Sequence, residues 1–215
     1  MLYYSSVMAQ KPWLNEGSKM NDHQIIKLRI VGKRPLLMHS ETLANPLNPI
    51  TRQHKALTDK SGKLRTQEDQ WAIAESEWRA GIYFDEEHGP HLPDKCLEAS
   101  LTAGARRRKL GKAITRSVVF VDDVHPLEYD GPRTLKGLWD KAFYDLRTVK
   151  QGQSRIPRCR PMFTHWALNC TLAVDVKELD AEKVISAFSE AGLYCGIGDY
   201  RPKFGRFSVE VLSYE

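Results

Sequence analysis

The sequence has few of the features that define several large classes of protein. It contains only four cysteines, Cys96, Cys159, Cys170 and Cys195. They form no Cys-x-x-Cys pair, and no histidine stands at the spacing of a zinc ligand, so we expect reduced, mostly buried thiols. His88 and His91 form a His-x-x-His pair around Gly89-Pro90, but histidines in such an expected turn are more often solvated than metal-bound. We therefore expect no metal and no other cofactor.

Long apolar runs are also missing. No segment approaches the roughly 20 residues that a membrane-spanning helix requires. The opening MLYYSSVMAQKPW lacks the basic region and long apolar stretch of a signal peptide. We therefore expect a cytoplasmic protein without membrane contact. Residues 1–23 show no sustained period, which indicates an N-terminal arm or extension, with Met20 as an alternative natural start.

Complete catalytic patterns are absent as well. The sequence has no Walker motif, no Ser-His-Asp arrangement and no paired-carboxylate pattern. What it has is the composition of a globular protein, with 41% hydrophobic and 27% charged residues among 215. Its 32 Lys and Arg residues exceed its 27 Asp and Glu residues, which gives a net charge of +5 and suits a polyanionic partner. We therefore expect a binding protein and not an enzyme.

The first patterned segment predicts a half-buried strand over residues 25–31. Ile26, Leu28 and Ile30 alternate there with Lys27 and Arg29. The two cations would share the exposed face of the strand, where they become candidate nucleic-acid contacts. A long connection rich in proline and polar residues follows over residues 32–65, with one short helix expected after Asn48 and Pro49.

Two helices are expected in the middle of the chain. Thr66 and Asp69 resemble a capping box, which begins a helix that ends at Gly81. The second helix spans about residues 94–109 and ends in the run Arg106, Arg107, Arg108 and Lys109. Cations at a helix C-terminus favour the helix dipole, so the run is either a solvated helix end or a ridge that contacts phosphates. Lys112 and Arg116 extend it.

Residues 143–160 predict a basic hairpin that turns at Gln151-Gly152-Gln153. Five cations lie along this ribbon: Arg147, Lys150, Arg155, Arg158 and Arg160. Such an arm suits a phosphate backbone, although exposed hairpins are often charged only to remain soluble.

The C-terminal third predicts a strand over residues 166–174, a helix from Asp180 to Ala191 ended by Gly192, and a final strand from Phe207. Strand, helix, glycine-rich loop and strand form one half of a ferredoxin-like βαββαβ module, and residues 25–31 begin the other half. We therefore expect an α+β fold with a ferredoxin-like core. Residues 24–215 would form one domain, with insertions at about 32–65 and 143–160.

The loop before the last strand reads GIGDYRPKFGRF, residues 196–207, and combines three kinds of residue. They are the glycines Gly196, Gly198 and Gly205, the cations Arg201, Lys203 and Arg206, and the aromatic residues Tyr200 and Phe204. Glycines allow backbone amides to approach phosphates, arginines and lysines add charge, and aromatic rings stack on bases. The alternative is an ordinary turn in which Phe204 and Phe207 pack under the sheet.

This loop resembles the one that the RAMP superfamily of CRISPR-associated proteins carries between its last helix and last strand. Gly196, Gly198, Arg201 and the run Gly205-Arg206-Phe207 match its loose G-x-G-x-x-R-x-x-x-G-R-F pattern. The resemblance implies an RRM-like ferredoxin fold that holds RNA or single-stranded DNA in a groove and self-associates along the strand. The segments LLMHS, LEYDGP and GDYRPKFGRF also resemble segments of uncharacterised phage-encoded proteins.

Two alternatives to non-catalytic binding remain open. Some RAMP proteins are metal-independent endoribonucleases that use a histidine, and the resemblance implies His39 for that role, with Lys33 or Arg34 as the cation. The other alternative is a protein-interaction or inhibitor module.

Overall fold

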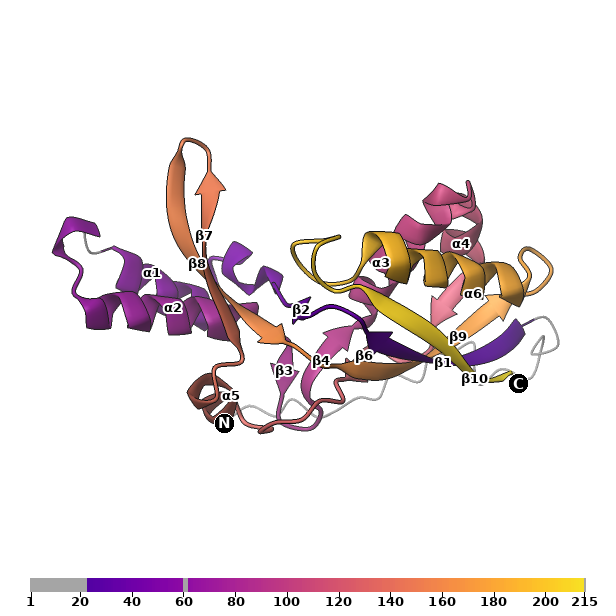
Figure 1. Cartoon of the computed structure of the whole chain (residues 1–215), viewed down its shortest axis with the longest axis horizontal. Coiled ribbons are helices and arrows are strands. Elements are labelled where there is room, and N and C mark those ends of the chain that lie inside the picture. Colours follow the sequence, from indigo (N-terminus) through magenta and orange to yellow (C-terminus); the bar gives the residue numbers. More distant parts are fainter. Residues whose placement is uncertain (1–22, 60–61, 215) are drawn as a thin grey trace.

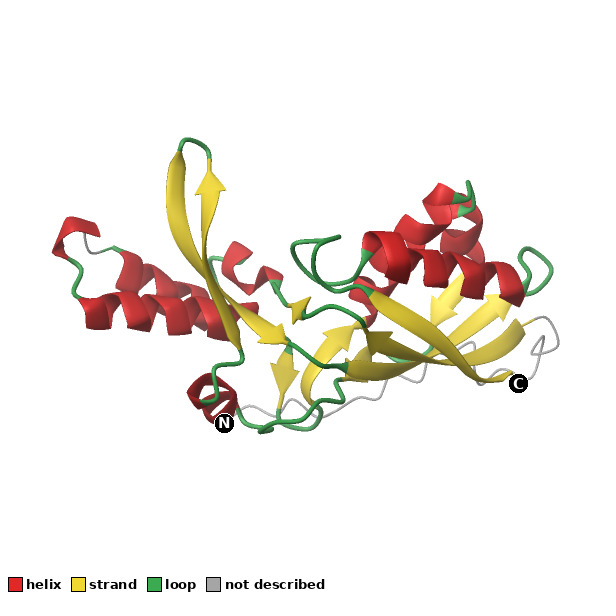
Figure 2. Cartoon of the chain, viewed as in Figure 1, coloured by secondary structure: helices red, strands yellow, loops and turns green. Residues whose placement is uncertain are grey.

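The computed structural model describes residues 23–59 and 62–214. The N-terminal arm expected over residues 1–23 lies outside this range except for His23. The described chain combines helices with antiparallel sheets, so the expected α+β class is confirmed (Figure 2).

A four-stranded antiparallel sheet forms one end of the molecule (Figure 1). Its strand order is β10-β1-β9-β5, with bounds Phe207–Tyr214, His23–Gly32, Ala167–Asp175 and Val118–Phe120. The strand predicted over residues 25–31 is the central β1, and its Ile26, Leu28 and Ile30 are fully buried. The strict alternation of the sequence arises because only one face of β1 contacts the core.

Two helices cover one face of this sheet, α3 (Asp94–Arg107) and α6 (Ala181–Glu190) (Figure 1). Leu97, Leu101 and Ala105 of α3 are buried, as the helical spacing predicted. The two helices approach closely at Gly104, where a β-carbon would lie 2.2 Å from the Ala187 carbonyl oxygen. The helix pair and the sheet therefore enclose one apolar core.

The predicted end of the last helix at Gly192 is wrong. The chain continues as a π-helical turn over Ala191–Cys195 and leaves the helix at Gly196, whose φ is 73°. Gly192 instead allows close packing, because a β-carbon there would lie 2.3 Å from the Phe207 carbonyl oxygen.

The other end of the molecule contains α1 (Pro49–Thr58), α2 (Gln67–Gly81) and the projecting hairpin of β7 (Tyr144–Gln151) and β8 (Ser154–Phe163) (Figure 1). The Asn48 side chain caps α1, and Thr66 with Asp69 forms the capping box of α2. The two helices and the hairpin therefore agree with the sequence patterns.

Several short elements were not expected. They are β2 (Leu36–Leu37), a 3-10 helix at Glu41–Ala44, another at Gly62–Leu64, β4 (Gly89–Pro93), α4 (Gly111–Ser117), β6 (Val124–Pro126) and α5 (Leu135–Asp140). β3 (Phe84–Asp85) overlaps a short strand that the sequence predicts over residues 82–84. β2 pairs with β8, while β3, β4 and β6 form a small sheet. Among the described residues no helix is long and apolar enough to cross a membrane.

Candidate nucleic-acid interface

The glycine-rich loop is held against the chain segment around β2. Within and beside the loop, the amide of Asp199 donates to the Leu37 carbonyl (2.8 Å), Gly205 to Pro35 (2.8 Å) and Ile197 to Gly205 (2.9 Å). These amides are therefore engaged inside the protein, which contradicts a phosphate nest built on them.

The three loop glycines have packing roles. Gly196, Gly198 and Gly205 all have φ between 68° and 79°, a region that favours glycine. A β-carbon would lie 2.4 Å from the Leu37 carbonyl oxygen at Gly198 and 1.8 Å from the Ile197 carbonyl oxygen at Gly205. The glycines therefore shape the loop, and a direct contact between them and a ligand stays a prediction.

The two aromatic residues of the loop differ in exposure. Phe204 is only 8% exposed, whereas Tyr200 is 46% exposed and meets the Phe204 ring edge to face at 6.0 Å. Burial leaves Phe204 little surface for a base, so its expected stacking role is not supported by the geometry. Tyr200 keeps a ring face that a base can reach.

The three cations of the loop also differ. Arg201 and Lys203 are exposed, and neither forms an ion pair within the described part of the chain. Arg206 is half-buried, and its Nε donates to the Pro202 carbonyl oxygen at 2.9 Å. Arg201 and Lys203 are therefore the loop cations that are available to a phosphate.

The hairpin and the glycine-rich loop, which were predicted separately, are in contact. The guanidinium of Arg147 on β7 lies 4.6 Å from the centre of the Phe204 ring and 5.4 Å from that of Tyr200. Arg160 on β8 forms an ion pair with Asp199 of the loop. Arg147 donates hydrogen bonds to the Asp145 carboxylate, and this pairing raises the pKa of Arg147. These two arginines are neutralised by carboxylates, so their role is to position the loop against the hairpin.

Cations at the tip of the hairpin remain exposed. Lys150 and Arg155 face each other across the two strands, and neither forms an ion pair among the residues described. Like charges in directly opposed positions destabilise a strand pair, so an anionic partner would relieve them. We call Lys150, Arg155, Tyr200, Arg201 and Lys203 the loop–hairpin surface.

Arg158, predicted as a phosphate contact, has a structural role. Its guanidinium donates to Glu77 of α2 at 2.9 Å, and Glu77 also accepts the Cys159 amide at 2.9 Å. Glu77 is only 7% exposed. Because a buried carboxylate needs such partners, Arg158 is committed to holding the hairpin on α2.

The cations of β1 are less available than the strand pattern predicted. Arg29 donates to both carboxylate oxygens of Glu128, at 2.9 and 2.5 Å, and this pairing raises the pKa of Arg29. Asn169 donates to the same carboxylate at 3.1 Å. Lys27 lies on the same face and also interacts with another residue. This face of the sheet is therefore close to neutral around Arg29.

The arginines at the end of α3 differ in their contacts. Arg108 binds Glu190 at 2.8 Å, and Arg107 lies 3.7 Å from the same carboxylate and 4.3 Å from the centre of the Tyr194 ring. These two arginines tie α3 to α6 and its π-helical turn. Arg106 is exposed and forms no ion pair with the described residues.

A pocket of about 240 Å³ lies beside the loop and contains His39. It is lined by His39, Glu41, Tyr83, Lys95, Cys96, Ala99, Gly198 and Arg201. Lys95 pairs with Glu41 at 2.5 Å, and burial raises the pKa of both Tyr83 and Cys96. Sequence reasoning missed Tyr83 and Lys95, because only the fold brings them to His39. The described residues contain no cluster of three or more His, Cys, Asp or Glu that could hold a metal.

No family model and no curated protein matches the sequence. Among solved structures, the fold is similar to a chain in "Cryo-EM structure of the Type III-B Cmr-beta bound to cognate target RNA", with a TM-score of 0.51 and 11% identity. The match covers 91% of this chain and 61% of that one, so this chain spans less than two thirds of its neighbour. A second match, Csc2 of Thermofilum pendens, has 11% identity over 99% of this chain and 71% of that one, but a TM-score of only 0.32. The first match shows a similarity of fold alone, and a phage origin stays a prediction.

Proposed function

We propose that this chain binds single-stranded nucleic acid, RNA or DNA, without cleaving it, and that the loop–hairpin surface makes the contact. The observation that carries the proposal is the set of four exposed cations, Lys150, Arg155, Arg201 and Lys203, that no carboxylate of the described residues neutralises. They lie on two segments joined by the Arg147 and Arg160 contacts. Cations on such a surface bind phosphates and release counterions.

Tyr200 supplies the second component of single-strand binding. Its exposed ring lies 5.4 Å from the Arg147 guanidinium of the hairpin, and a base could stack on its exposed part. Such stacking contributes about 1 to 3 kcal/mol per base with little sequence preference. A surface with this combination favours single strands over duplexes, whose bases are already stacked.

The strand order supports a ferredoxin-like core of the RAMP type as part of the proposal. β1, α3, β5, β9, α6 and β10 follow one another as βαββαβ, and the order β10-β1-β9-β5 places the first and third strands in the centre. The neighbour with the similar fold is described as bound to target RNA, which supports RNA as the ligand. Self-association along the strand, which the RAMP resemblance implies, belongs to the same proposal.

Fluorescence anisotropy with labelled single-stranded RNA and DNA tests the proposal. We expect the affinity to fall steeply between about 50 and 200 mM salt. Arg201→Gln with Lys203→Gln should lower both the affinity and the salt slope, by about 0.7 units of slope per lost phosphate contact on a single strand. The control is Lys136→Gln with Lys141→Gln, on and beside α5, which changes the net charge by the same amount. Its affinity and salt slope should equal those of the wild type. No binding at low salt would refute the proposal.

A metal-independent endoribonuclease is the second candidate, because the pocket brings His39 together with Lys95, Tyr83 and Arg201. A histidine beside cations has the components of acid-base cleavage of RNA. Incubation of labelled RNA with the protein, in the presence of a metal chelator, distinguishes binding alone from metal-independent cleavage. Intact RNA supports binding alone, whereas cleavage that His39→Ala abolishes while affinity persists would establish the nuclease.

A further inference from the structure

An open basin of about 860 Å³ lies between the end of α3 and α4, apart from the loop–hairpin surface. Its lining consists of Thr102, Arg106, Lys109, Gly111, Lys112, Thr115 and Arg116. Four of these seven residues are cations, and all four are exposed. They come from α3, from the turn after it and from α4, so the fold and not the sequence run alone gathers them.

The charges of the basin are not neutralised. Within the described residues, none of Arg106, Lys109, Lys112 and Arg116 forms an ion pair. Lys112 and Arg116 stand four residues apart on α4, a spacing at which like charges destabilise a helix. The adjacent Arg107 and Arg108, in contrast, are paired with Glu190. The basin therefore collects four cations for which the described part of the chain provides no counter-charge.

Lys109 occupies an unfavourable backbone position in this basin. The amide of Leu110 donates to the Ala105 carbonyl (2.9 Å), and that of Lys109 donates to Arg106 (3.1 Å), which together make a Schellman motif. The residue after the cap of such a motif takes a left-handed conformation and is usually glycine, but here it is Lys109 with φ of 61°. This unfavourable position of Lys109 supports a functional role for its side chain.

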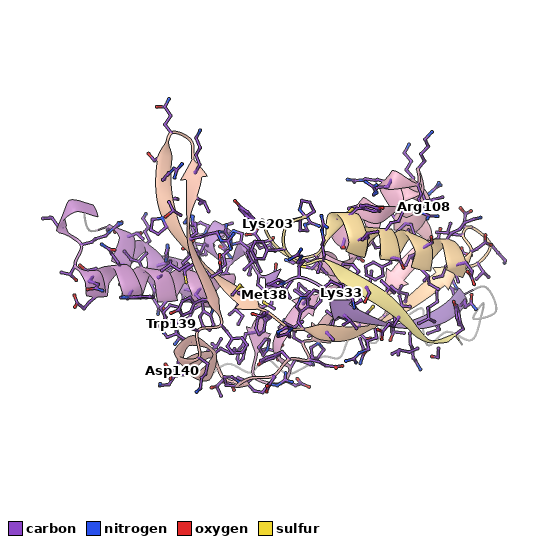
Figure 3. All side chains as sticks on the ribbon, in the orientation of Figure 1. Lys33, Met38, Arg108, Trp139, Asp140 and Lys203 are labelled. Carbon is purple, nitrogen blue, oxygen red and sulfur yellow. The ribbon has the colours of Figure 1, made fainter. Side chains whose placement is uncertain are left out.

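We propose that this basin is a second anion site that binds a run of phosphates. The open shape and the spread of cations over three segments suit the backbone of a nucleic-acid strand better than a small enclosed ligand. The turn between α3 and α4 projects to the same side of the molecule as the hairpin and the glycine-rich loop (Figure 1). Arg108 and Lys203 mark this side in Figure 3. As a contact to the same strand, the site rests on the proposed function, but its phosphate binding can be measured separately.

Isothermal titration of the full chain with inorganic tripolyphosphate tests the site without any strand. Lys112→Gln with Arg116→Gln should weaken binding roughly tenfold or more, since two charge-assisted contacts are lost. The matched pair Lys136→Gln with Lys141→Gln should leave it unchanged. Equal affinity in the basin variant and the wild type, or no binding at low salt, would overturn the proposal.

Lys109→Gly separates a binding role from a structural one. Glycine is favoured at this left-handed position, so the melting temperature should stay the same or rise. Tripolyphosphate affinity should nevertheless fall. A variant that keeps full affinity would show that Lys109 does not belong to the site.

Anisotropy with the labelled RNA and DNA strands identifies the source of the phosphates. If a strand crosses the basin, Lys112→Gln with Arg116→Gln lowers the salt slope, and its effect adds to that of Arg201→Gln with Lys203→Gln. If only the loop variant changes the affinity for the strand, the strand does not contact the basin. The ligand of the basin would then be a free polyphosphate. Loss of tripolyphosphate binding in the basin variant, without any strand binding by the wild type, would refute the proposed function and retain the site.

Discussion

Gly205 shows how much a single position can constrain the candidate site. A β-carbon there would lie 1.8 Å from the Ile197 carbonyl oxygen, and its φ of 68° already disfavours other residues. Gly152, in the hairpin turn, has a similar φ of 60° but no atom within 4 Å of such a carbon. An added β-carbon would therefore cause only backbone strain at Gly152, but both backbone strain and steric overlap at Gly205.

We predict that Gly205→Ala destabilises the protein well beyond Gly152→Ala. The hairpin change should cost only the strain of the left-handed conformation, about 1 to 2 kcal/mol. Gly205→Ala adds the steric overlap with the Ile197 carbonyl oxygen and should therefore disrupt the glycine-rich loop. Urea denaturation of both variants measures the difference. Equal unfolding free energies would mean that the loop relaxes without cost and that the close packing at Gly205 is unimportant.

Buried thiols predict a loss of stability at alkaline pH. Burial raises the pKa of Cys159 and of Cys170 to about 12 from an ordinary value of 9.0. The folded state thus keeps these protons while the unfolded state releases them, so the stability they contribute is present below pH 9 and falls as the pH rises toward 12. Denaturation midpoints of the wild type and Cys170→Ala across this range test the effect. A wild-type slope equal to that of the variant would contradict the contribution of Cys170.

Among the secondary-structure elements, the hairpin depends on one buried carboxylate. Glu77 of α2 binds both the Arg158 side chain and the Cys159 amide, whereas Glu75 makes a half-buried pair with Arg79 on the same helix. Glu77→Gln should cost about 1 to 3 kcal/mol, because it weakens two partly buried hydrogen bonds. Glu75→Gln is the matched control and should cost less than about 1 kcal/mol. Urea denaturation and hydrogen exchange in β8 measure both variants, and similar costs would refute the anchoring role of Glu77.

The elements with strong local patterns were predictable, and those fixed by distant contacts were not. Ile26, Leu28 and Ile30 identified β1, and the Thr66–Asp69 capping box identified α2, because these signals lie within a few residues. The short β2 exists only because it pairs with β8, more than a hundred residues later. The partners of Arg29 and Arg158 could not be predicted for the same reason, since Glu128 and Glu77 are remote in sequence. Charge can be read from a sequence, but its neutralisation cannot.

At the scale of the molecule, the hairpin, the glycine-rich loop and the α3–α4 turn project to one side, while α5 lies on the other (Figure 1). Each of these three segments carries exposed cations. Arg147 and Arg160 join the first two of these segments. Such an arrangement supports a strand that crosses the molecule over several short contacts, each of which adds a phosphate to the salt dependence.

The most direct measurement is the salt dependence of single-strand affinity in a variant that lacks the four cations of the loop–hairpin surface. Lys150→Gln, Arg155→Gln, Arg201→Gln and Lys203→Gln together should reduce the slope of log affinity against log salt by roughly three units, at about 0.7 for each lost phosphate contact on a single strand. The melting temperature should change little, because exposed cations contribute little to stability. A variant that is folded and keeps the wild-type affinity and slope would contradict the assignment of nucleic-acid binding to this surface.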